Sequence, residues 1–189
     1  MAANLIQRGV LALLSGLVLA ACASAPVPAP EPEQVEPAAV TRLFLVRHGE
    51  KEAGSDPALT EAGAIRAETL ADLLADEEVT EVWSTQTRRT EQTAAPAAAR
   101  RGLAIQAYDA STLPAFASWL LDTPGVKLVV GHSNTTDALA GLLGADPGPP
   151  INDETEFDRI YIISVDTDGM VRSRIERYGA PSSAIVVAE

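Results

Sequence analysis

Short apolar runs alternate with helix-like segments from residue 41 onward, and this alternation limits the folds open to the chain. The strand-like runs cover residues 42–47, 79–83, 103–108 and 126–130; the helix-like segments cover residues 60–74, 87–100, 112–121 and 134–143. Two further runs, 159–165 and 170–178, flank the hairpin signal Asp-Thr-Asp-Gly. Alternating strands and helices favour a parallel sheet covered on both faces. We therefore predict an α/β three-layer sandwich, with a mainly parallel central sheet, an antiparallel edge hairpin and helices on both faces.

Two of the predicted helices carry specific local signals. Thr60 can cap the first of them, and an apolar stripe follows that would face the sheet. The stripe consists of Ile65, Leu70, Leu73 and Leu74. Pro96 lies inside the second helix, where the missing N–H predicts a kink or a restart.

The first 40 residues differ in character from the rest. Arg8 is the only charged residue before Glu31, and the uncharged run GVLALLSGLVLAAC follows it, as in a signal peptide. The ending Leu-Ala-Ala-Cys resembles the bacterial lipoprotein signal, in which the cysteine, here Cys22, is lipidated and becomes the mature N-terminus. A plain secretory signal with an incidental cysteine is the alternative. Because Cys22 is the only cysteine, no disulfide can form within the chain.

The lipoprotein interpretation divides the chain into three parts. Residues 1–21 would be a lipoprotein signal peptide, and residues 22–40 a lipidated cysteine with a Pro/Ala/Glu-rich tether. Residues 41–189 would form the folded domain. We expect that domain to be held in the cell envelope by a membrane lipid anchor, on the periplasmic or extracellular side.

The formal net charge of -12 constrains the partners. A nucleic-acid-binding protein presents a basic surface, which this composition does not provide, so we expect no nucleic-acid partner. An acidic protein also repels anions at long range, and any phosphate site must therefore rest on a local group of arginines.

Such a group is predicted where the strands end. The chain has only two histidines, and each directly follows an apolar run, in Arg47-His48-Gly49 and in Gly131-His132-Ser133. The run ending at Trp83 leads into the pair Arg88-Arg89. Ligands of open α/β sheets bind at the carboxyl ends of the strands, and guanidinium groups match phosphate oxygens. Beside two imidazoles, these arginines indicate an anion site.

Four stretches carry a resemblance to a known family. LFLVRHGE resembles the R-H-G signature of the histidine phosphatase superfamily, the phosphoglycerate mutase-like fold. DPALTEAGAIRAETLADLL, WSTQTRRTEQTA and VVGHSNT are similar to further stretches of that family, in the same order. The resemblance covers essentially the whole domain from residue 41.

The resemblance implies a role for each matched residue. His48 would attack phosphorus and form a phosphohistidine that water hydrolyses. Arg47, Arg89 and His132 would hold the phosphoryl oxygens. Arg89, rather than Arg88, matches the family position, because it precedes Gln92 and Thr93 at the expected spacing. No metal and no cofactor are implied.

Two departures from the family pattern affect the predicted site. Many members carry an asparagine shortly after R-H-G, where Gly54 stands here. The acid that protonates the leaving oxygen is also open: Asp109 lies just past the third strand-like run, and Glu50 lies next to the nucleophile in sequence. We favour Asp109 and keep Glu50 as the alternative.

The spacing of the motifs bears on the substrate. Only ten residues separate His48 from Leu59, which indicates a small, open phosphatase rather than a mutase. The loop 144–156 is the segment expected to face the substrate, a small phosphorylated molecule or a phosphoprotein.

Three alternatives compete with a histidine phosphatase. VVGHSNT resembles a serine-hydrolase elbow with Ser133 as nucleophile, but that fold needs a later histidine and none follows His132. A metallohydrolase could use the histidines and carboxylates, although the usual H-x-H or H-E-x-x-H spacing is lacking. A tethered domain could also bind a phosphorylated ligand without turnover.

Overall fold

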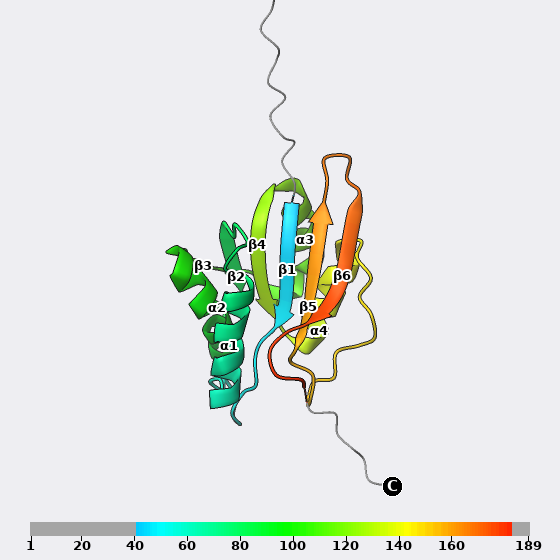
Figure 1. Ribbon diagram of the computed structural model, residues 1–189. Helices are drawn as coiled ribbons and strands as arrows, with labels where there is room; N and C mark the ends of the chain where they lie inside the picture. Colours follow the sequence, from blue (N-terminus) through cyan, green and yellow to red (C-terminus); the bar gives the residue numbers. More distant parts are fainter. Residues whose placement is uncertain (1–40, 183–189) are drawn as a thin grey trace, which may run out of the picture. The chain divides into compact units, whose positions relative to one another are not determined.

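A computed structural model describes residues 41–182, which form a six-stranded sheet in the order β3-β2-β4-β1-β5-β6 (Figure 1). The strands are β1 (Thr41–Arg47), β2 (Glu81–Ser84), β3 (Ile105–Ala107), β4 (Gly125–Gly131), β5 (Arg159–Val165) and β6 (Val171–Arg177). The helices are α1 (Glu61–Leu73), α2 (Arg88–Arg101), α3 (Leu113–Asp122) and α4 (Ser133–Leu142), with a short 3₁₀ turn at Ala110–Thr112.

The strand pairing confirms the predicted fold class. Strands β1 to β4 are mutually parallel, whereas β5 pairs antiparallel with β1, and β6 antiparallel with β5. The predicted turn closes the β5–β6 hairpin through a hydrogen bond from Gly169 N to Asp166 O (3.0 Å). Strand β3 is shorter than predicted: Gly102 ends α2 in a left-handed conformation, and Leu103 still bonds back to that helix.

Alternate residues of β1 build two cores on opposite faces of the sheet, as the two-residue period of a strand requires. Leu43 and Leu45 pack with α3 and α4, whereas Phe44 and Val46 pack with α1 and α2. In Figure 1, α1 and α2 lie in front of the sheet and α3 and α4 behind it. The central strands are thus buried on both sides, and their carboxyl ends are left as the place for polar residues.

The predicted apolar stripe of α1 is wrong in half of its members. Leu70 and Leu74 are buried, but Ile65 is 62% exposed and Leu73 44% exposed. Arg66 is buried instead, because its guanidinium donates to the Glu50 carboxylate and to the carbonyl oxygens of Tyr178 and Ala180. This polar network rotates α1 away from the orientation that hydrophobicity alone favours.

The proline in α2 does not divide that helix. Residues 88–101 form one helix with Pro96 inside it, so the predicted restart is wrong.

Gly63 lets α1 approach the segment that follows β1. A β-carbon at this position would overlap the carbonyl oxygen of Glu50. We expect Gly63→Ala to lower the free energy of unfolding by about 3 kcal/mol, as overpacking does, measured by urea denaturation. The control is Gly141→Ala in α4, where the nearest atoms are Pro147 side-chain carbons at 3.9 Å. An unchanged urea midpoint in Gly63→Ala would contradict this account of the approach.

The predicted signal, the tether and Cys22 lie outside the described residues. Within residues 41–182, none of the helices combines the length and the apolar character needed to cross a membrane.

Candidate active site

The two histidines meet at the carboxyl end of the sheet. Arg47 at the end of β1 is in register with Gly131 at the end of β4, and the backbone N–H of His48 donates to Gly131 O (3.0 Å). The ring centroids of His48 and His132 are 5.6 Å apart in an edge-on arrangement. The parallel pairing of β1 with β4 therefore accounts for the proximity of residues more than eighty positions apart in sequence.

The His48 ring is neutral and oriented. Nδ1 lies 2.8 Å from the carbonyl oxygen of Gly49, which can only accept, so Nδ1 carries the proton and Nε2 keeps its lone pair. Burial lowers the pKa of His48 to about 3, and the positive charges of Arg47 and Arg89 add to the effect. A neutral imidazole with a free Nε2 has the form that a nucleophile requires.

His132 lies between a hydroxyl group and a guanidinium group. Its Nε2 is 2.9 Å from Thr85 Oγ1, and its Nδ1 is 3.3 Å from a terminal nitrogen of Arg89. Burial, followed by the charges of Arg89 and Arg47, lowers the pKa of His132 to about 4. Both rings in the site are therefore neutral near pH 7.

Arg47 is held by a loop that the sequence only suggested as substrate-facing. Its two terminal nitrogens donate to the backbone oxygens of Asn152, Asp153 and Glu156 and to the Asp153 carboxylate (2.8 Å). The centre of the Phe157 ring lies 4.2 Å from the guanidinium carbon of Arg47. The loop covers the site closely, since Arg47 is 1% exposed and His48 2% exposed. The resemblance identified the arginine but not this clamp, which has no recognisable sequence signal.

Two arginine N–H groups point to an anion. Four buried side-chain nitrogen or oxygen atoms within the described residues lack a hydrogen-bond partner, and two of them are Nε of Arg47 and Nε of Arg89. A buried donor without an acceptor is costly, and a guanidinium donor most of all. Both belong to the site with the two histidines, where a phosphoryl oxygen could satisfy them.

The two proposed acids differ in their surroundings. Asp109 lines a hollow of about 560 Å³ together with His132. Its carboxylate accepts from the backbone N–H of Ser111 (2.8 Å), a bond that lowers the pKa of Asp109. Burial raises the pKa of Glu50, but hydrogen bonds from Arg66 outweigh it and hold the value below normal. In this structure both groups are carboxylates, and only Asp109 is free of an arginine.

The structure also describes the residues that bear on the missing asparagine, on a serine hydrolase and on a metallohydrolase. Gly54 has a φ of +132°, and a side chain there would meet no atom within 4 Å. Ser133, the first residue of α4, donates to Asp153 Oδ1 (2.6 Å) and not to a histidine base. Among residues 41–182, no group of three or more His, Cys, Asp or Glu side chains could hold a metal ion.

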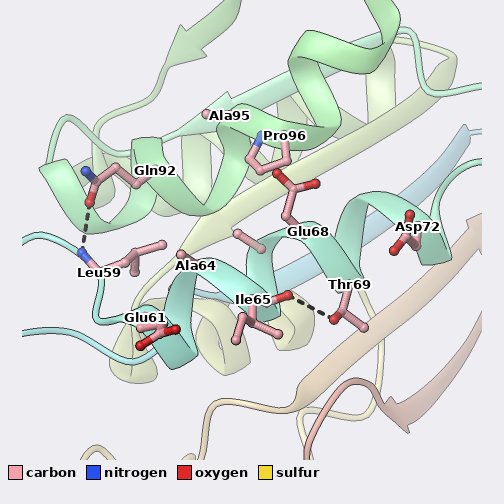
Figure 2. A pocket seen from close by; sticks show the side chains of 11 residues that line it. Leu59, Glu61, Ala64, Ile65, Glu68, Thr69, Asp72, Gln92, Ala95 and Pro96 are labelled. Atoms are coloured by element: carbon pink, nitrogen blue, oxygen red, sulfur yellow. Dashed lines mark hydrogen bonds between the residues drawn. The ribbon is translucent and has the colours of Figure 1, made fainter.

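A second hollow, of about 630 Å³, lies between α1 and α2 (Figure 2). It is lined largely by apolar side chains, among them Ile65 and Pro96. Two of its three acidic residues, Glu68 and Asp72, pair with Arg100. At one end, Gln92 accepts from the backbone N–H of Leu59 (2.8 Å). Neither histidine lines it, so this hollow does not belong to the candidate active site.

Low pKa values for the two histidines predict acid sensitivity. Both lie below the ordinary value of 6.5, so protonation favours the unfolded chain. The free energy of unfolding should fall as the pH drops below about 6.5, by on the order of 2 kcal/mol per histidine at about pH 5. Urea denaturation at about pH 7 and about pH 5 measures this. A double variant, His48→Gln with His132→Gln, should lose much less stability, and an equal loss would contradict the assignment.

Comparisons with known proteins bear on the family and on the fold. The sequence profile of the histidine phosphatase superfamily (branch 1) matches residues 43–110. A search of curated proteins gives no significant match.

Solved structures share the fold at low sequence identity. A mycobacterial glucosyl-3-phosphoglycerate phosphatase, Rv2419c, superposes with a TM-score of 0.57 and 17% identity, over 75% of this chain and 99% of that one. A candidate phosphohistidine phosphatase SixA from Agrobacterium tumefaciens gives 0.53 and 25%, over 75% and 99%. The protein histidine phosphatase SixA in complex with tungstate gives 0.56 and 20%, over 72% and 96%.

The range of the profile match includes Arg47, His48 and Arg89, whereas His132 lies outside it. The resemblance to the histidine phosphatase superfamily is thereby confirmed.

Proposed function

We propose that the protein is a phosphatase that hydrolyses phosphate monoesters through a phosphohistidine formed on His48. One arrangement carries the proposal: the neutral His48 ring, with a free Nε2, lies in a site with two arginines whose buried Nε–H groups lack an acceptor. The first group can attack phosphorus, and the others can bind phosphoryl oxygens. A phosphate ester is the substrate that uses both.

The proposed reaction has two steps. His48 Nε2 forms a bond to phosphorus while the bond from phosphorus to the leaving oxygen breaks. The Nδ1–H bond to Gly49 O stabilises the positive charge that develops on the ring. Water then attacks the phosphohistidine and releases phosphate, so that no metal ion is needed for either step. Arg47 and Arg89 would stabilise the charge on the oxygens throughout.

Asp109 is the proposed general acid. It shares a hollow with His132 and is not paired with an arginine, whereas Arg66 holds Glu50. A carboxylate must take up a proton before it can act, and a less polar environment around a bound leaving group would favour that. Asp109→Asn should therefore slow the hydrolysis of an alkyl phosphate much more than that of p-nitrophenyl phosphate. Equal effects on the two esters would contradict this assignment and indicate that Glu50 or the solvent protonates the leaving oxygen.

The activity is tested on the purified full-length protein in the presence of a chelator. Phosphate release from p-nitrophenyl phosphate is expected in the wild type and should be slower by about 10³-fold or more in His48→Gln. Loss of activity in the chelator would instead support a metallohydrolase. No release from a broad panel of aryl, alkyl, acyl and phosphoramidate substrates would contradict the phosphatase.

A binding function is the second candidate, favoured by the closure of the site. The loop 152–156 occupies both terminal nitrogens of Arg47, and His48 is almost fully covered. A domain that stayed in this form would bind phosphate or a phosphorylated ligand weakly and would not turn it over. Phosphate binding by calorimetry without phosphoenzyme formation would identify this case.

The substrate class is proposed as a small phosphorylated molecule or a phosphoprotein, since similar structures include phosphatases described for each.

The Leu-Ala-Ala-Cys stretch supports lipid attachment at Cys22 in the cell envelope. Labelling of cells with a radioactive fatty acid should mark the wild type and not Cys22→Ser. Equal label in both would leave the anchor without support.

A further inference from the structure

The backbone of Gly49 is held by a side chain from α2. Thr93 is fully buried, and its Oγ1 lies 3.0 Å from the backbone nitrogen of Gly49 and 2.7 Å from the carbonyl oxygen of Arg89. A threonine inside a helix commonly gives its hydroxyl hydrogen to the carbonyl group four residues earlier. Both directions are fixed by the partners, because a backbone N–H can only donate and a carbonyl oxygen can only accept. Thr93 therefore donates to Arg89 and accepts from Gly49.

The close approach of α1 explains why a glycine stands at position 49. A β-carbon there would lie 2.9 Å from the carbonyl oxygen of Gly63 and 3.1 Å from its α-carbon, too close for a side chain. Glycine has more backbone freedom than other residues, so its conformation must be restrained by its surroundings. The hydrogen bond to Thr93 restrains the nitrogen end of Gly49.

The carbonyl end of Gly49 is the group that orients the proposed nucleophile. Gly49 O lies 2.8 Å from Nδ1 of His48 and accepts its proton, which leaves the lone pair on Nε2. The residues on either side are tied to other elements: His48 N donates to Gly131 O (3.0 Å), and Glu50 O accepts from Thr60 N (2.9 Å). Thr93 supplies the corresponding restraint for the residue between them.

We infer that Thr93 is a positioning residue, which holds Gly49 so that the Gly49 carbonyl oxygen keeps the His48 proton on Nδ1 and leaves Nε2 free to attack. Thr93 would not touch the substrate, because it is buried and gives its only hydroxyl hydrogen to Arg89. The consequence for turnover rests on the proposed phosphatase, whereas the tautomer of His48 does not.

Thr93→Val tests the inference, because it keeps the shape of the side chain and removes the hydroxyl. The buried N–H of Gly49 then loses its acceptor, and the residue is expected to turn toward another one. Part of the His48 population should then carry the proton on Nε2, where it blocks attack. We expect kcat for p-nitrophenyl phosphate to fall about tenfold, the effect of losing one hydrogen bond. The dissociation constant of inorganic phosphate should stay within about twofold, since the side chains of Arg47, Arg89 and His132 are unchanged.

The tautomer is measured by long-range ¹⁵N–¹H NMR of the purified full-length protein. The chain has two histidines, so only two rings contribute, and His48→Gln assigns them. The wild type is expected to show protonated Nδ1 and bare Nε2 in His48, and the share of protonated Nε2 should rise in Thr93→Val. Lower stability alone would not change the tautomer of the folded protein, so this signal separates positioning from a merely structural role.

Thr93→Ser is the matched control, since it retains the hydroxyl. It should keep the Nδ1–H tautomer and a kcat within about twofold of the wild type, and a tenfold loss in this variant would overturn the inference. So would a folded Thr93→Val protein with the wild-type tautomer or the wild-type kcat. A loss of phosphate affinity as large as the loss of kcat would indicate general distortion of the site and would also overturn it.

The wild type alone gives a further decision. Protonated Nε2 in its His48 ring would overturn the inference, whatever any variant does. If the wild type turns over no ester, the proposed function fails, but the His48 tautomer in the wild type and in Thr93→Val still decides this inference.

Discussion

Replacing His48 with glutamine is expected to lower turnover by about 10³-fold or more, the scale seen when a covalent nucleophile is removed. The glutamine amide can still donate to Gly49 O, as Nδ1 of His48 does at 2.8 Å, but it offers no lone pair that can attack phosphorus. The loss should lie in kcat, measured as phosphate release from p-nitrophenyl phosphate.

Binding provides the control for His48→Gln. Arg47 and Arg89 remain in the variant, so inorganic phosphate should bind with an affinity within a few-fold of the wild type. The urea midpoint should also stay near the wild-type value at about pH 7, where His48 is neutral. A variant that binds phosphate normally and keeps more than a tenth of the turnover would show that His48 is not the nucleophile.

Arg89→Gln is expected to lower kcat/KM by about 10²- to 10³-fold, the usual effect of removing one fixed group that stabilises the transition state. The Arg89 side chain is 19% exposed, and its Nε–H is buried without an acceptor. Its contact with His132 Nδ1 aims it into the site. Steady-state kinetics with p-nitrophenyl phosphate measure the loss.

The neighbouring arginine serves as the control for Arg89. Arg88 has the same charge, stands one position earlier in α2 and is exposed. Arg88→Gln should keep kcat/KM within about twofold, because the exposed Arg88 side chain does not belong to the site. The overall charge changes equally in both variants, so a difference between them reflects position and not charge. Equal losses in the two would indicate long-range attraction of the anion rather than a bound guanidinium.

The sequence predicts the fold well because the strongest physical signals are local. Buried parallel strands are almost entirely apolar, so the end of β1 at Arg47 and the end of β4 at Gly131 are visible as changes of composition. Each is followed at once by a histidine. Since parallel strands share one carboxyl edge, the meeting of His48 and His132 follows from those positions.

The rest of the site depends on contacts that no local pattern encodes. Burial of Arg66 in place of Ile65 is set by Glu50 and by two carbonyl groups more than a hundred residues away. The clamp on Arg47 uses backbone oxygens, which any sequence provides. The hydrogen bond between the hydroxyls of Thr85, after β2, and Thr90, in α2, likewise depends on how the two elements pack.

The central claim is a covalent bond between His48 and phosphorus, and trapping that bond is its most direct test. Full-length protein is mixed with a ³²P-labelled phosphate ester, and the reaction is quenched within milliseconds. One half of the sample is then incubated in acid and the other half in base. We predict label on the protein that is lost in acid and kept in base, and that is absent from His48→Gln. Label that survives acid would contradict the account. Rapid phosphate release with no label on the protein would contradict it as well.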